Sequence, residues 1–321
     1  MYKPSYTWPN KAFPFRVYFE NKNLRVFIIE NIQHNWNWLS EYSRFFKDSD
    51  YFFVYCGWYH SEYFAKEADK IFSELSLNKS NFFFMFNEDR EKVNFEEKGF
   101  IGDVINQNAW LDENLVMKVL PNTSKLYDAV YVGRFSPFKR HFLAEKVHNL
   151  ALVAGVNHSN KDIDTVPDHS YLNNVPLDPH QVCSIINKSR CGLILSAEEG
   201  ACFASSEYLL CGIPVVSTQS LGGRATWYND YNSIVCDDTP SSIKDAVDFF
   251  VNNPRDPHKI RDAHISLARH YRAKFISIFA KLLYDHAIYD VDAEFYFKEN
   301  FMHKLRKSYA PDFDSIFRNK K

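Results

Sequence analysis

The chain has 321 residues, enough for two domains that can each bury a hydrophobic core. Its formal net charge of −2 at pH 7 excludes the broad basic field that indicates binding to nucleic acid. Aromatic residues make up 17% of the sequence, and because many lie in apolar, strand-like runs we expect most of them in the core. Six cysteines without a Cys-x-x-Cys pair, and no apolar run of about eighteen residues, predict a soluble, cytoplasmic protein with reduced thiols.

Strand-like and helix-like segments alternate along the first part of the chain, a pattern typical of an α/β fold with a parallel sheet. Two helices are expected here, over residues 36–46 and 62–75. A polar connector at residues 121–125 leads into the second half. The expected strands of the first part are residues 24–29, 51–55, 82–86 and 102–106.

The same alternation continues in the second half. Asp178 followed by Pro179 predicts a helix that ends near Lys188, with Asp as the N-cap and Pro at the first helical position. Another helix is expected to begin near Lys139 and to run to about Asn149. The remaining expected elements are helices over residues 240–251 and 257–287, strands around Val130 and at residues 150–154, 191–195, 215–217 and 233–236, and an aromatic, helix-like tail at residues 289–321.

Two acidic residues stand out after the strand at residues 191–195. This strand leads through a short loop into a helix, which Gly212 and Pro214 bring to an end. Glu207 lies in the middle of that helix beside apolar residues, where burying an unpaired carboxylate is costly, so we expect it to meet a polar ligand. Glu199 precedes the helix, so its carboxylate can lie near the free N–H groups of the first turn, which suit phosphate. Together these features suggest a sugar nucleotide.

A basic segment follows the first strand of the second half and reads Gly133-Arg134-Phe-Ser-Pro-Phe-Lys139-Arg140-His141. Its last three residues crowd the N-terminal end of the helix predicted there, where the helix dipole disfavours cations. We therefore expect an anion at this position, with Arg140 and His141 in supporting roles.

The motif Glu-Gly-x6-Glu, followed by Gly-x-Pro-Val-Val, resembles the donor-site signature of family 4 glycosyltransferases, retaining enzymes of the GT-B fold. The resemblance implies that Glu199 contacts hydroxyl groups of the transferred sugar and that Glu207 holds the ribose. It assigns Arg134 and Lys139 to the donor diphosphate, whose negative charge grows as the anomeric bond breaks. The family usually reads Glu-Gly-Phe-Gly-Leu at the first acid, whereas the residues at the implied donor contacts here are Gly200, Ala201, Cys202 and Phe203.

The resemblance also implies the domain organisation. It covers residues from about 100 to 285 well, and it predicts two Rossmann-like domains that face each other across a cleft. Residues 1–120 form a short, divergent acceptor-side domain, and residues 121–288 form the domain that binds the nucleotide-sugar donor. Residues 289–321 form a helical tail that packs back on the first domain.

Further donor contacts are implied by position in the family pattern. The pair Gly222-Gly223 lies where the family places two glycines that face the donor, and Arg224 follows it. Residues 171–175 lie where the nucleobase loop is expected. The donor contacts implied in this way are Gly133, Gly222, Gly223, Asn173 and Asn174.

Two histidines of the first half follow strand ends, where the ligand-facing loops of open α/β sheets lie. The family often places a first-domain histidine against the donor sugar, and His34 or His60 can take this role or be satisfied structural residues. Aromatic side chains nearby can either stack on the sugar rings of an acceptor or pack between helix and sheet. They are Trp36, Trp38, Trp58 and Tyr59.

Asp-x-Asp pairs occur four times, and such a pair can hold Mn²⁺ or Mg²⁺ against a diphosphate. Chance pairs are expected among 40 acidic residues, and none lies in the donor segments, so we expect no essential metal ion and no other cofactor. The pairs are Asp48/Asp50, Asp162/Asp164, Asp290/Asp292 and Asp312/Asp314.

The function implied is retaining transfer of a sugar from a nucleoside diphosphate sugar to an acceptor hydroxyl, in the synthesis of polysaccharide, lipopolysaccharide or another glycoconjugate. The acceptor is a glycan, a lipid-linked molecule or another hydroxyl compound, which also allows peripheral association with the inner face of a membrane. Two alternatives stay open. One is a sugar-nucleotide epimerase of the same fold, and the other is a non-catalytic protein that binds a nucleotide sugar.

Overall fold

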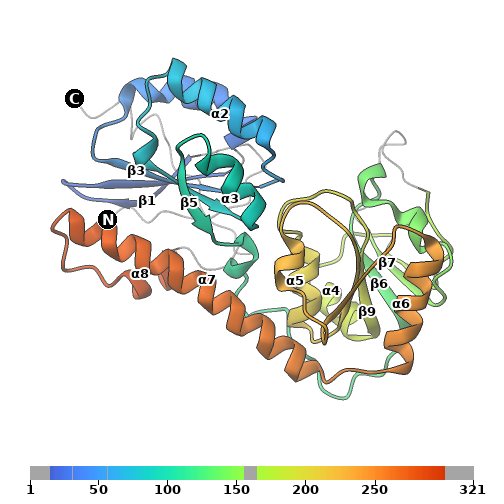
Figure 1. Cartoon of the computed structure of the whole chain (residues 1–321). Helices are drawn as coiled ribbons and strands as arrows, with labels where there is room; N and C mark the ends of the chain where they lie inside the picture. Colours follow the sequence, from blue (N-terminus) through green and yellow to red (C-terminus); the bar gives the residue numbers. More distant parts are fainter. Residues whose placement is uncertain (1–14, 31, 56, 155–164, 301–321) are drawn as a thin grey trace. The chain divides into compact units, whose positions relative to one another are not determined.

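The computed structural model describes residues 15–30, 32–55, 57–154 and 165–300, and the chain forms two compact units. Unit 1 combines Met1–Asp112 with Ala268–Lys321, and unit 2 is Glu113–Leu267. The sequence led us to expect domain limits at residues 120 and 288, whereas the two units meet after Asp112 and after Leu267. Helix α7 (Pro257–Asp285) belongs to unit 2 at its start and to unit 1 at its end (Figure 1). An uninterrupted helical pattern does not show where along its length a helix changes its packing partners.

Unit 1 contains a five-stranded sheet in the order β1-β2-β3-β4-β5 among the described residues. Strands β2 to β5 are parallel, as the alternation of strands and helices predicted. Strand β1 pairs antiparallel with β2 at one edge and was not predicted from the sequence. The strands are β1 (Phe15–Glu20), β2 (Arg25–Ile29), β3 (Asp50–Tyr55), β4 (Phe82–Phe86) and β5 (Ile101–Val104).

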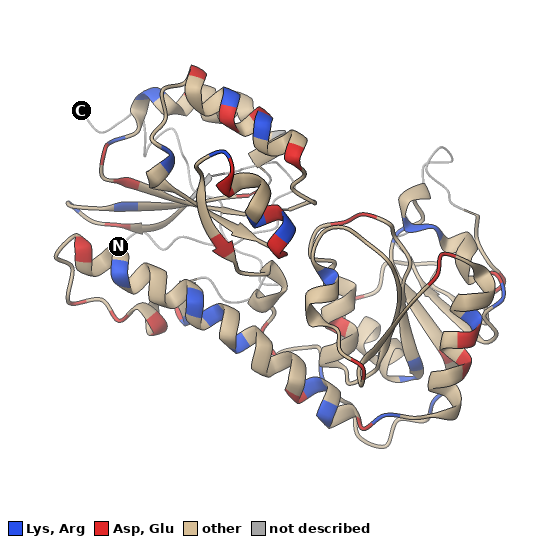
Figure 2. Ribbon diagram, viewed as in Figure 1, with Lys and Arg blue, Asp and Glu red and all other residues tan. Residues whose placement is uncertain are grey.

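Short helices connect these strands. Ser61 caps α2, because its Oγ accepts a hydrogen bond of 3.3 Å from the backbone N–H of Phe64. The exposed side of α2 carries lysines beside acidic residues, as Figure 2 shows, in i,i+4 ion pairs that contribute little to stability. The helical elements are η1 (Ile32–His34), α1 (Trp36–Tyr42), η2 (Ser43–Phe45), α2 (Glu62–Glu74), η3 (Lys79–Asn81), α3 (Asp89–Glu96), η4 (Gln107–Trp110) and α8 (Ala293–Asn300).

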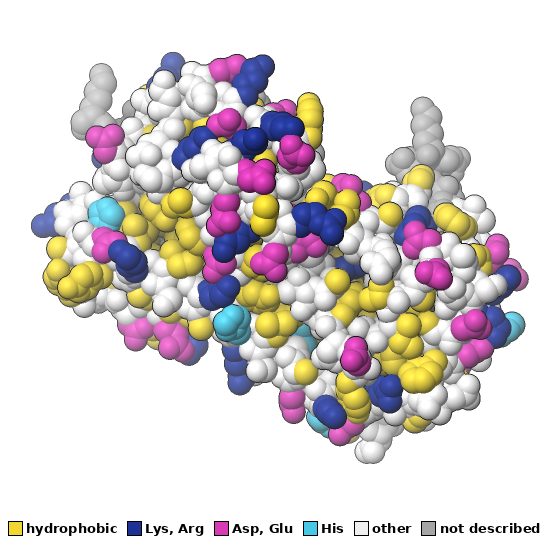
Figure 3. Space-filling view, viewed as in Figure 1, with side chains coloured by type: hydrophobic (Ala, Val, Ile, Leu, Met, Phe, Trp, Pro, Cys, Tyr) yellow, Lys and Arg dark blue, Asp and Glu magenta, His cyan; other side chains and the backbone are white. Residues whose placement is uncertain are grey.

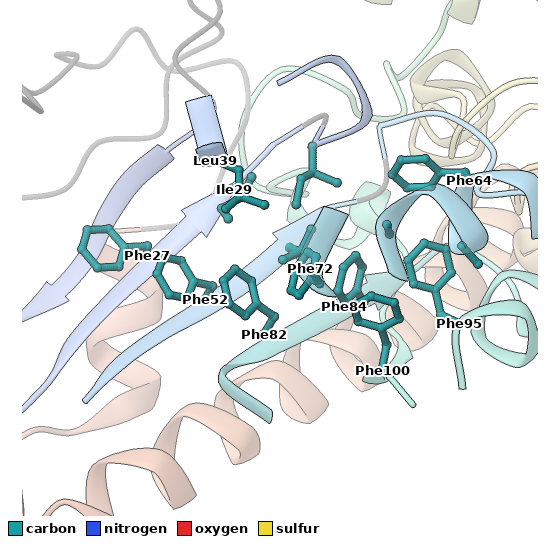
Figure 4. Packing of buried hydrophobic residues seen from close by; sticks show 14 of the residues in the cluster. Phe27, Ile29, Leu39, Phe52, Phe64, Phe72, Phe82, Phe84, Phe95 and Phe100 are labelled. Carbon is teal, nitrogen blue, oxygen red and sulfur yellow. The ribbon is translucent and has the colours of Figure 1, made fainter. Parts of the chain in front are cut away.

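Phenylalanine side chains build the core between the sheet of unit 1 and its helices (Figure 4). The ring of Phe52 stacks on the rings of Phe27 and Phe82, with centroid distances of 5.1 and 4.3 Å. From α2, Phe72 meets Phe82 edge-on at 4.7 Å. Burying each such ring contributes roughly 1.5–3 kcal/mol. The prediction that most aromatic residues of this half lie in the core is confirmed.

The other face of this sheet is covered by the C-terminal part of unit 1. Phe275 of α7 packs at 4.8 Å from Phe53 and at 5.4 Å from Trp110. Tyr296 of α8 donates a hydrogen bond of 2.5 Å from its hydroxyl to the carbonyl oxygen of Tyr18. The expected helical tail therefore lies in unit 1 as far as residue 300, and its remaining residues, 301–321, are outside the described part of the chain.

Unit 2 contains a six-stranded sheet in the order β11-β10-β9-β6-β7-β8 among its described residues, and all neighbouring strands are parallel. From β6 the chain first builds outward through β7 and β8, and then returns to place β9, β10 and β11 on the other side. The neighbours β6 and β9 therefore form a topological switch point, the position at which open α/β sheets bind ligands. The strands are β6 (Tyr127–Val132), β7 (Leu150–Val153), β8 (Tyr171–Leu172), β9 (Ser189–Ile194), β10 (Val215–Thr218) and β11 (Ser233–Cys236).

The helix signals of the second half are confirmed where they are local. Asp178 and Gln181 form a capping box at the start of α4, with hydrogen bonds of 2.9 Å in each direction. Gly212 ends α5 with φ of 73°, the left-handed conformation that favours glycine. The helical elements of unit 2 are η5 (Pro137–Lys139), η6 (His141–Ala144), α4 (Pro179–Asn187), α5 (Phe203–Leu210), η7 (Arg224–Trp227), α6 (Pro240–Asn252) and the start of α7.

The helix predicted from Lys139 to Asn149 is wrong. Two short 3-10 turns, η5 and η6, take its place, and Arg140 between them has φ of 55°, which a right-handed helix does not allow. Lys139 therefore does not lie at the N-terminal end of an α-helix, and no helix dipole acts on it there. The cationic side chains of this segment are placed by tertiary contacts instead.

On the face that Figure 3 shows, Lys and Arg lie among Asp and Glu over both units, without a continuous basic area. Within the described ranges, no helix combines the length and the apolar character that crossing a membrane requires.

Candidate active site at the switch point of unit 2

The loops that follow β6 and β9 carry the three residues expected at the diphosphate and the sugar, which are Arg134, Lys139 and Glu199. Lys139 ends η5 in the loop after β6, and Glu199 lies in the loop after β9. Their side chains form an ion pair between Nζ and Oε1, and both are largely buried, with 12% and 9% of the side-chain surface exposed. The hydroxyl of Tyr131, on β6, donates a hydrogen bond of 2.5 Å to the carbonyl oxygen of Lys139 and fixes its backbone. The fold thus joins the two segments that the sequence identified separately.

The carboxylate of Glu199 is held by several groups. Ser196 donates a hydrogen bond of 2.6 Å from Oγ to Oε2. Burial by itself raises the pKa of Glu199, but the charge and hydrogen bond of Lys139, with hydrogen bonds from Ser196 and Cys202, outweigh burial and lower this pKa from its ordinary value. Glu199 is therefore ionised at neutral pH, and side chains, not the first turn of α5, bind its carboxylate.

Arg140 anchors the loop after β6. Its Nε donates to the carbonyl oxygen of Leu195 at 2.6 Å, its Nη2 to Oγ1 of Thr218 at 2.8 Å, and its Nη1 to Asp238 at 2.5 Å. These bonds connect the loop to the ends of β9 and β10. Because Arg140 directly follows Lys139, the same bonds hold the Lys139 backbone in place, which agrees with the supporting role expected for Arg140.

Arg134 remains exposed in the same loop. Its guanidinium lies 5.6 Å from the ring centroid of Phe138, and it forms no hydrogen bond or ion pair with any described residue. It is thus available for an anion. Gly133 precedes it at the end of β6, where an added Cβ would be in ordinary contact with the Lys139 side chain at 3.6 Å, so this glycine is not required by sterics.

Helix α5 carries the second acidic residue, Glu207. Burial, together with the nearby Cys183 thiol, raises the pKa of Glu207 to about 7. The carboxylate is half-buried and has no hydrogen bond or ion pair to a described residue. The next residue, Tyr208, accepts a hydrogen bond of 2.7 Å from the Val132 N–H and donates one of 3.3 Å to the carbonyl oxygen of Leu193. Tyr208 thereby fixes α5 on β6 and β9 at the switch point.

The start of α5 is closely packed. Gly200, Ala201 and Cys202 are buried, and Phe203 is half-buried. Cys202 is the N-cap residue with φ of 53°, and its side chain does not cap the helix but lies near Glu199. Burial raises the pKa of the Cys202 thiol to about 12, so this side chain is a neutral hydrogen-bond donor at neutral pH.

The paired glycines pack against the loop of Glu199. Gly222 and Gly223 are buried and have φ of 110° and 85°. An added Cβ at Gly222 would lie 1.6 Å from the carbonyl oxygen of Glu199, so only glycine fits there. A backbone hydrogen bond of 3.1 Å from the Glu199 N–H to the carbonyl oxygen of Leu221 ties the two loops together. The observed role of the pair is therefore to support the Glu199 loop.

In the segment expected at the nucleobase, residues 171–175, the side-chain amide of Asn173 forms hydrogen bonds within the protein. Asn173 is buried, and its side chain exchanges hydrogen bonds of 2.7 and 2.6 Å with the backbone of Ala154. Its Nδ2 also donates to the carbonyl oxygen of Val175 at 2.9 Å. Asn174 is exposed. Asn173 thus holds the loop, and Asn174 is the one of the two whose side chain can reach a ligand.

The histidines of the first half differ in what the structure shows. His60 is fully buried, and its ring packs edge-on at 4.5 Å from Phe64, with Nδ1 2.6 Å from the carbonyl oxygen of Trp58. The ring is part of the core of unit 1, which favours the structural role of His60 over contact with a sugar. His34 ends η1, and its side chain lies outside what the structure describes.

Trp36 packs at 5.4 Å from Phe64, and its indole N–H donates to Glu67 at 3.0 Å. Trp38 packs at 5.3 Å from Tyr42. Both tryptophans lie against the core of unit 1, which favours the packing interpretation over stacking on an acceptor sugar.

The Asp-x-Asp pairs that the structure describes have structural partners. Asp50 is buried in a salt bridge with Arg25, with N···O distance 2.5 Å, and Asp292 accepts hydrogen bonds from the first N–H groups of α8. No group of three or more His, Cys, Asp or Glu side chains suited to a metal ion occurs among the described residues. The pairs at residues 162/164 and 312/314 lie outside these residues.

The structure adds residues that the sequence did not single out. Ser196, Tyr131 and Tyr208 place the two loops and α5. A serine directly after a buried strand was the available signal for Ser196. The tyrosines gave none, because they cannot be told from core aromatics in a sequence.

A scan against models of protein families gave no match, and neither did a search of curated protein sequences. Solved structures do match. TarM aligns with 79% of this chain at 13% identity and a TM-score of 0.55, and the chain spans 54% of TarM. The alignment with HepE from Anabaena, in complex with UDP and glucose, covers 79% of this chain and 77% of the HepE chain. The sequence identity is 12% and the TM-score is 0.55.

The alignment with sucrose-phosphate synthase from Thermosynechococcus elongatus covers 82% of this chain and 73% of the synthase chain, at 14% identity and a TM-score of 0.53. These neighbours are glycosyltransferases of the GT-B fold. At such low identity the likeness establishes the fold, which is the GT-B class that the sequence resemblance predicted.

Proposed function

We propose that this protein is a glycosyltransferase that moves a sugar from a nucleoside diphosphate sugar to an acceptor hydroxyl. The observation that carries the proposal is the ion pair of Lys139 with Glu199 at the switch point of unit 2, next to the helix that bears Glu207. The fold supports it, because the same fold is found in sugar-nucleotide enzymes such as HepE, which has been crystallised with UDP and glucose.

The cations serve the diphosphate. Arg134 is exposed and has no hydrogen bond or ion pair with a described residue, so it can meet an incoming diphosphate first. Lys139 shares its charge between Glu199 and the diphosphate once the donor is bound. As the anomeric bond breaks, the charge on the diphosphate grows, and a cation fixed in a largely buried site stabilises it better than water does.

The carboxylates serve the rest of the donor. Glu199 is ionised and fixed, so it can accept hydrogen bonds from sugar hydroxyl groups and orient the anomeric carbon. The half-buried carboxylate of Glu207 has no hydrogen-bond partner among the described residues. A ribose that donates hydrogen bonds from its two hydroxyl groups would be such a partner. The contacts of the nucleobase come from the loop of Asn174.

We further propose that the transfer retains the anomeric configuration and needs no metal ion or other cofactor. The acceptor hydroxyl attacks from the face that the diphosphate leaves, the new glycosidic bond forms as the old C–O bond breaks, and a diphosphate oxygen takes the hydroxyl proton. Arg134 and Lys139 take the place of a divalent cation at the diphosphate. The acceptor is a glycan, a lipid-linked molecule or another hydroxyl compound.

The proposal is tested in two steps. Thermal-shift measurements with UDP-, GDP- and ADP-sugars identify the donor, and release of the nucleoside diphosphate is then measured with and without candidate acceptors. We expect release that depends on an acceptor, and its loss in Glu199→Gln. Glu145→Gln, at an exposed acid of the same unit, is the matched control.

Two other outcomes reject the proposal. An epimerase would convert the donor sugar without an acceptor and without releasing diphosphate into solution. A binding protein would be stabilised by the donor but would leave it intact with every acceptor.

A further inference from the structure

Arg224 is the most deeply buried cation near the candidate site, with 1% of its surface exposed. It begins η7, directly after the glycine pair that packs under the Glu199 loop. A guanidinium cannot give up its charge in a protein, so its burial requires partners for its N–H groups. Those partners show what Arg224 does.

The hydrogen bonds of the Arg224 guanidinium go to groups within unit 2. Its Nη1 donates to Oγ of Ser196 at 2.6 Å, its Nε to Oγ of Ser217 at 3.2 Å, and its Nη2 to the carbonyl oxygen of Thr218 at 3.0 Å. Its Nη1 also lies 3.9 Å from Oε2 of Glu199. The guanidinium is thus held by hydrogen bonds within unit 2.

Ser196 connects Arg224 to Glu199. A serine hydroxyl has one hydrogen to donate and two lone pairs that accept. Because the oxygen of Ser196 accepts from Arg224, its hydrogen is directed to Oε2 of Glu199, at 2.6 Å. A hydrogen bond from a cation also polarises the hydroxyl and strengthens the bond that it donates.

The charges around Glu199 have a consequence for donor binding. The ionisable groups that face its carboxylate are Lys139, Arg224, Cys202 and Tyr131, and only the first two carry charge at neutral pH. When Lys139 turns toward a diphosphate, Glu199 would be left as a buried carboxylate with a weakened ion pair. Arg224 stays at 3.9 Å on the other carboxylate oxygen and keeps it compensated.

We propose that Arg224 is a positioning residue that holds Glu199 oriented and ionised through the hydroxyl of Ser196, so that Lys139 is free to engage the donor. This inference rests on the proposed glycosyl transfer for its purpose, but the positioning itself can be measured without a substrate. Gly222 and Gly223 contribute to this arrangement. Their φ values of 110° and 85° turn the chain so that the Arg224 side chain lies beside Glu199.

The test follows the Glu199 carboxyl carbon by NMR in protein labelled with ¹³C at glutamate Cδ, with the signal assigned by its loss in Glu199→Gln. In Arg224→Met we expect the pKa of Glu199 to rise by about one unit or more, since an opposite charge this close typically lowers a carboxyl pKa by about 1–3 units. Arg224→Lys should restore part of the shift. Ser196→Ala, which removes only a hydroxyl, should raise the pKa as well and serves if Arg224→Met does not fold.

The matched control is Arg261→Met, which removes another arginine of unit 2 whose bonds go to the backbone carbonyl oxygens of Met117, Leu210 and Glu113. It should leave the pKa of Glu199 unchanged. An unchanged pKa in folded Arg224→Met, or in Ser196→Ala, overturns the inference.

Turnover separates this inference from the proposed function. If the pKa of Glu199 shifts but the wild-type protein transfers no sugar, positioning holds and glycosyl transfer fails. If transfer occurs, Arg224→Met should lower kcat by at least about tenfold, the effect of roughly 1.4 kcal/mol, while affinity for the free nucleoside diphosphate stays the same.

Discussion

Lys139 and Glu199 form an ion pair although 60 residues of sequence separate them. Each lies in a loop that follows one of the two strands at the switch point, β6 and β9. The pair joins a group that suits a leaving diphosphate to a group that suits sugar hydroxyls. Its two members should therefore affect binding and catalysis differently.

The first prediction separates these roles. Lys139→Met should lower turnover roughly 100-fold or more, because the charge of the leaving diphosphate loses a fixed cation. It should also weaken binding of the free nucleoside diphosphate. Glu199→Gln should lower turnover while leaving that binding nearly unchanged, since the proposed partner of Glu199 is the sugar and not the diphosphate. Isothermal titration calorimetry and steady-state kinetics measure both quantities, with Lys146→Met at an exposed lysine as the control. Identical losses of binding in the two variants would contradict the assignment.

The second prediction concerns pH and Glu207. Burial and Cys183 raise the pKa of Glu207 to about 7, so in the free protein it takes up a proton as the pH falls through 7. A ribose hydroxyl donates best to the ionised carboxylate, so nucleotide affinity should increase between pH 6 and pH 8. In Glu207→Gln the affinity should be lower by about 1.5–3 kcal/mol at pH 8 and should lose this dependence on pH. Calorimetric titrations at several pH values measure it.

The raised pKa of Glu207 also makes the stability of the protein depend on pH. The folded pKa of Glu207 lies above the ordinary value of 4.5, so the stability that the protonated form provides is lost as the pH rises from about 4.5 to 7. Glu207→Gln should therefore stabilise unit 2 more at pH 8 than at pH 5. A constant difference in the free energy of unfolding across this range, measured by urea unfolding, would show that Glu207 is not desolvated.

The third prediction concerns Gly222. Gly222→Ala should abolish most of the turnover, because its Cβ would lie 1.6 Å from the carbonyl oxygen of Glu199 and would force the loop to move. Gly99→Ala is the matched control, since Gly99 also has positive φ, 75°, but an added Cβ there meets nothing within 4 Å. The control should lose about 1 kcal/mol of stability and keep its turnover. Turnover retained in Gly222→Ala would show that the Glu199 loop does not have to be fixed.

The fourth prediction concerns metal ions. Transfer should continue at an unchanged rate after treatment with EDTA, because in the proposed site Arg134 and Lys139 supply the positive charge at the diphosphate. The measurement is release of nucleoside diphosphate before and after chelation, and again after adding Mn²⁺. Loss of activity with EDTA and its return with Mn²⁺ would assign the diphosphate to a metal site instead.

The fifth prediction concerns stereochemistry. The anomeric configuration of the donor sugar should be kept in the product, as the resemblance to a retaining family implies, and the ring of His60, one of the two first-half histidines considered for the sugar, is buried in the core of unit 1. The coupling constant of the anomeric proton in the product decides the matter. A β-linkage from an α-linked donor would reject retention.

The sequence by itself determined the elements whose signals are local. The capping box at Asp178, the stop at Gly212 and the apolar strands before the two loops all depend on residues a few positions apart, and the structure has them where they were expected. Glu199 and Glu207 were likewise placed before and within the correct helix. The aromatic runs of the first half became its core, because burial of rings needs only the right periodicity.

Tertiary structure alone decided how these elements act together. The helix expected after Lys139 fails because Arg140 gains hydrogen bonds to Leu195 and Thr218, which no local pattern reveals and which hold it in a left-handed conformation. His60 is part of the core, and α7 changes unit in mid-helix. The contact of Lys139 with Glu199 and the placement of Arg224 behind it depend on which strands are neighbours in the sheet. That order follows from the packing of the whole unit, so it cannot be read from residues close in sequence.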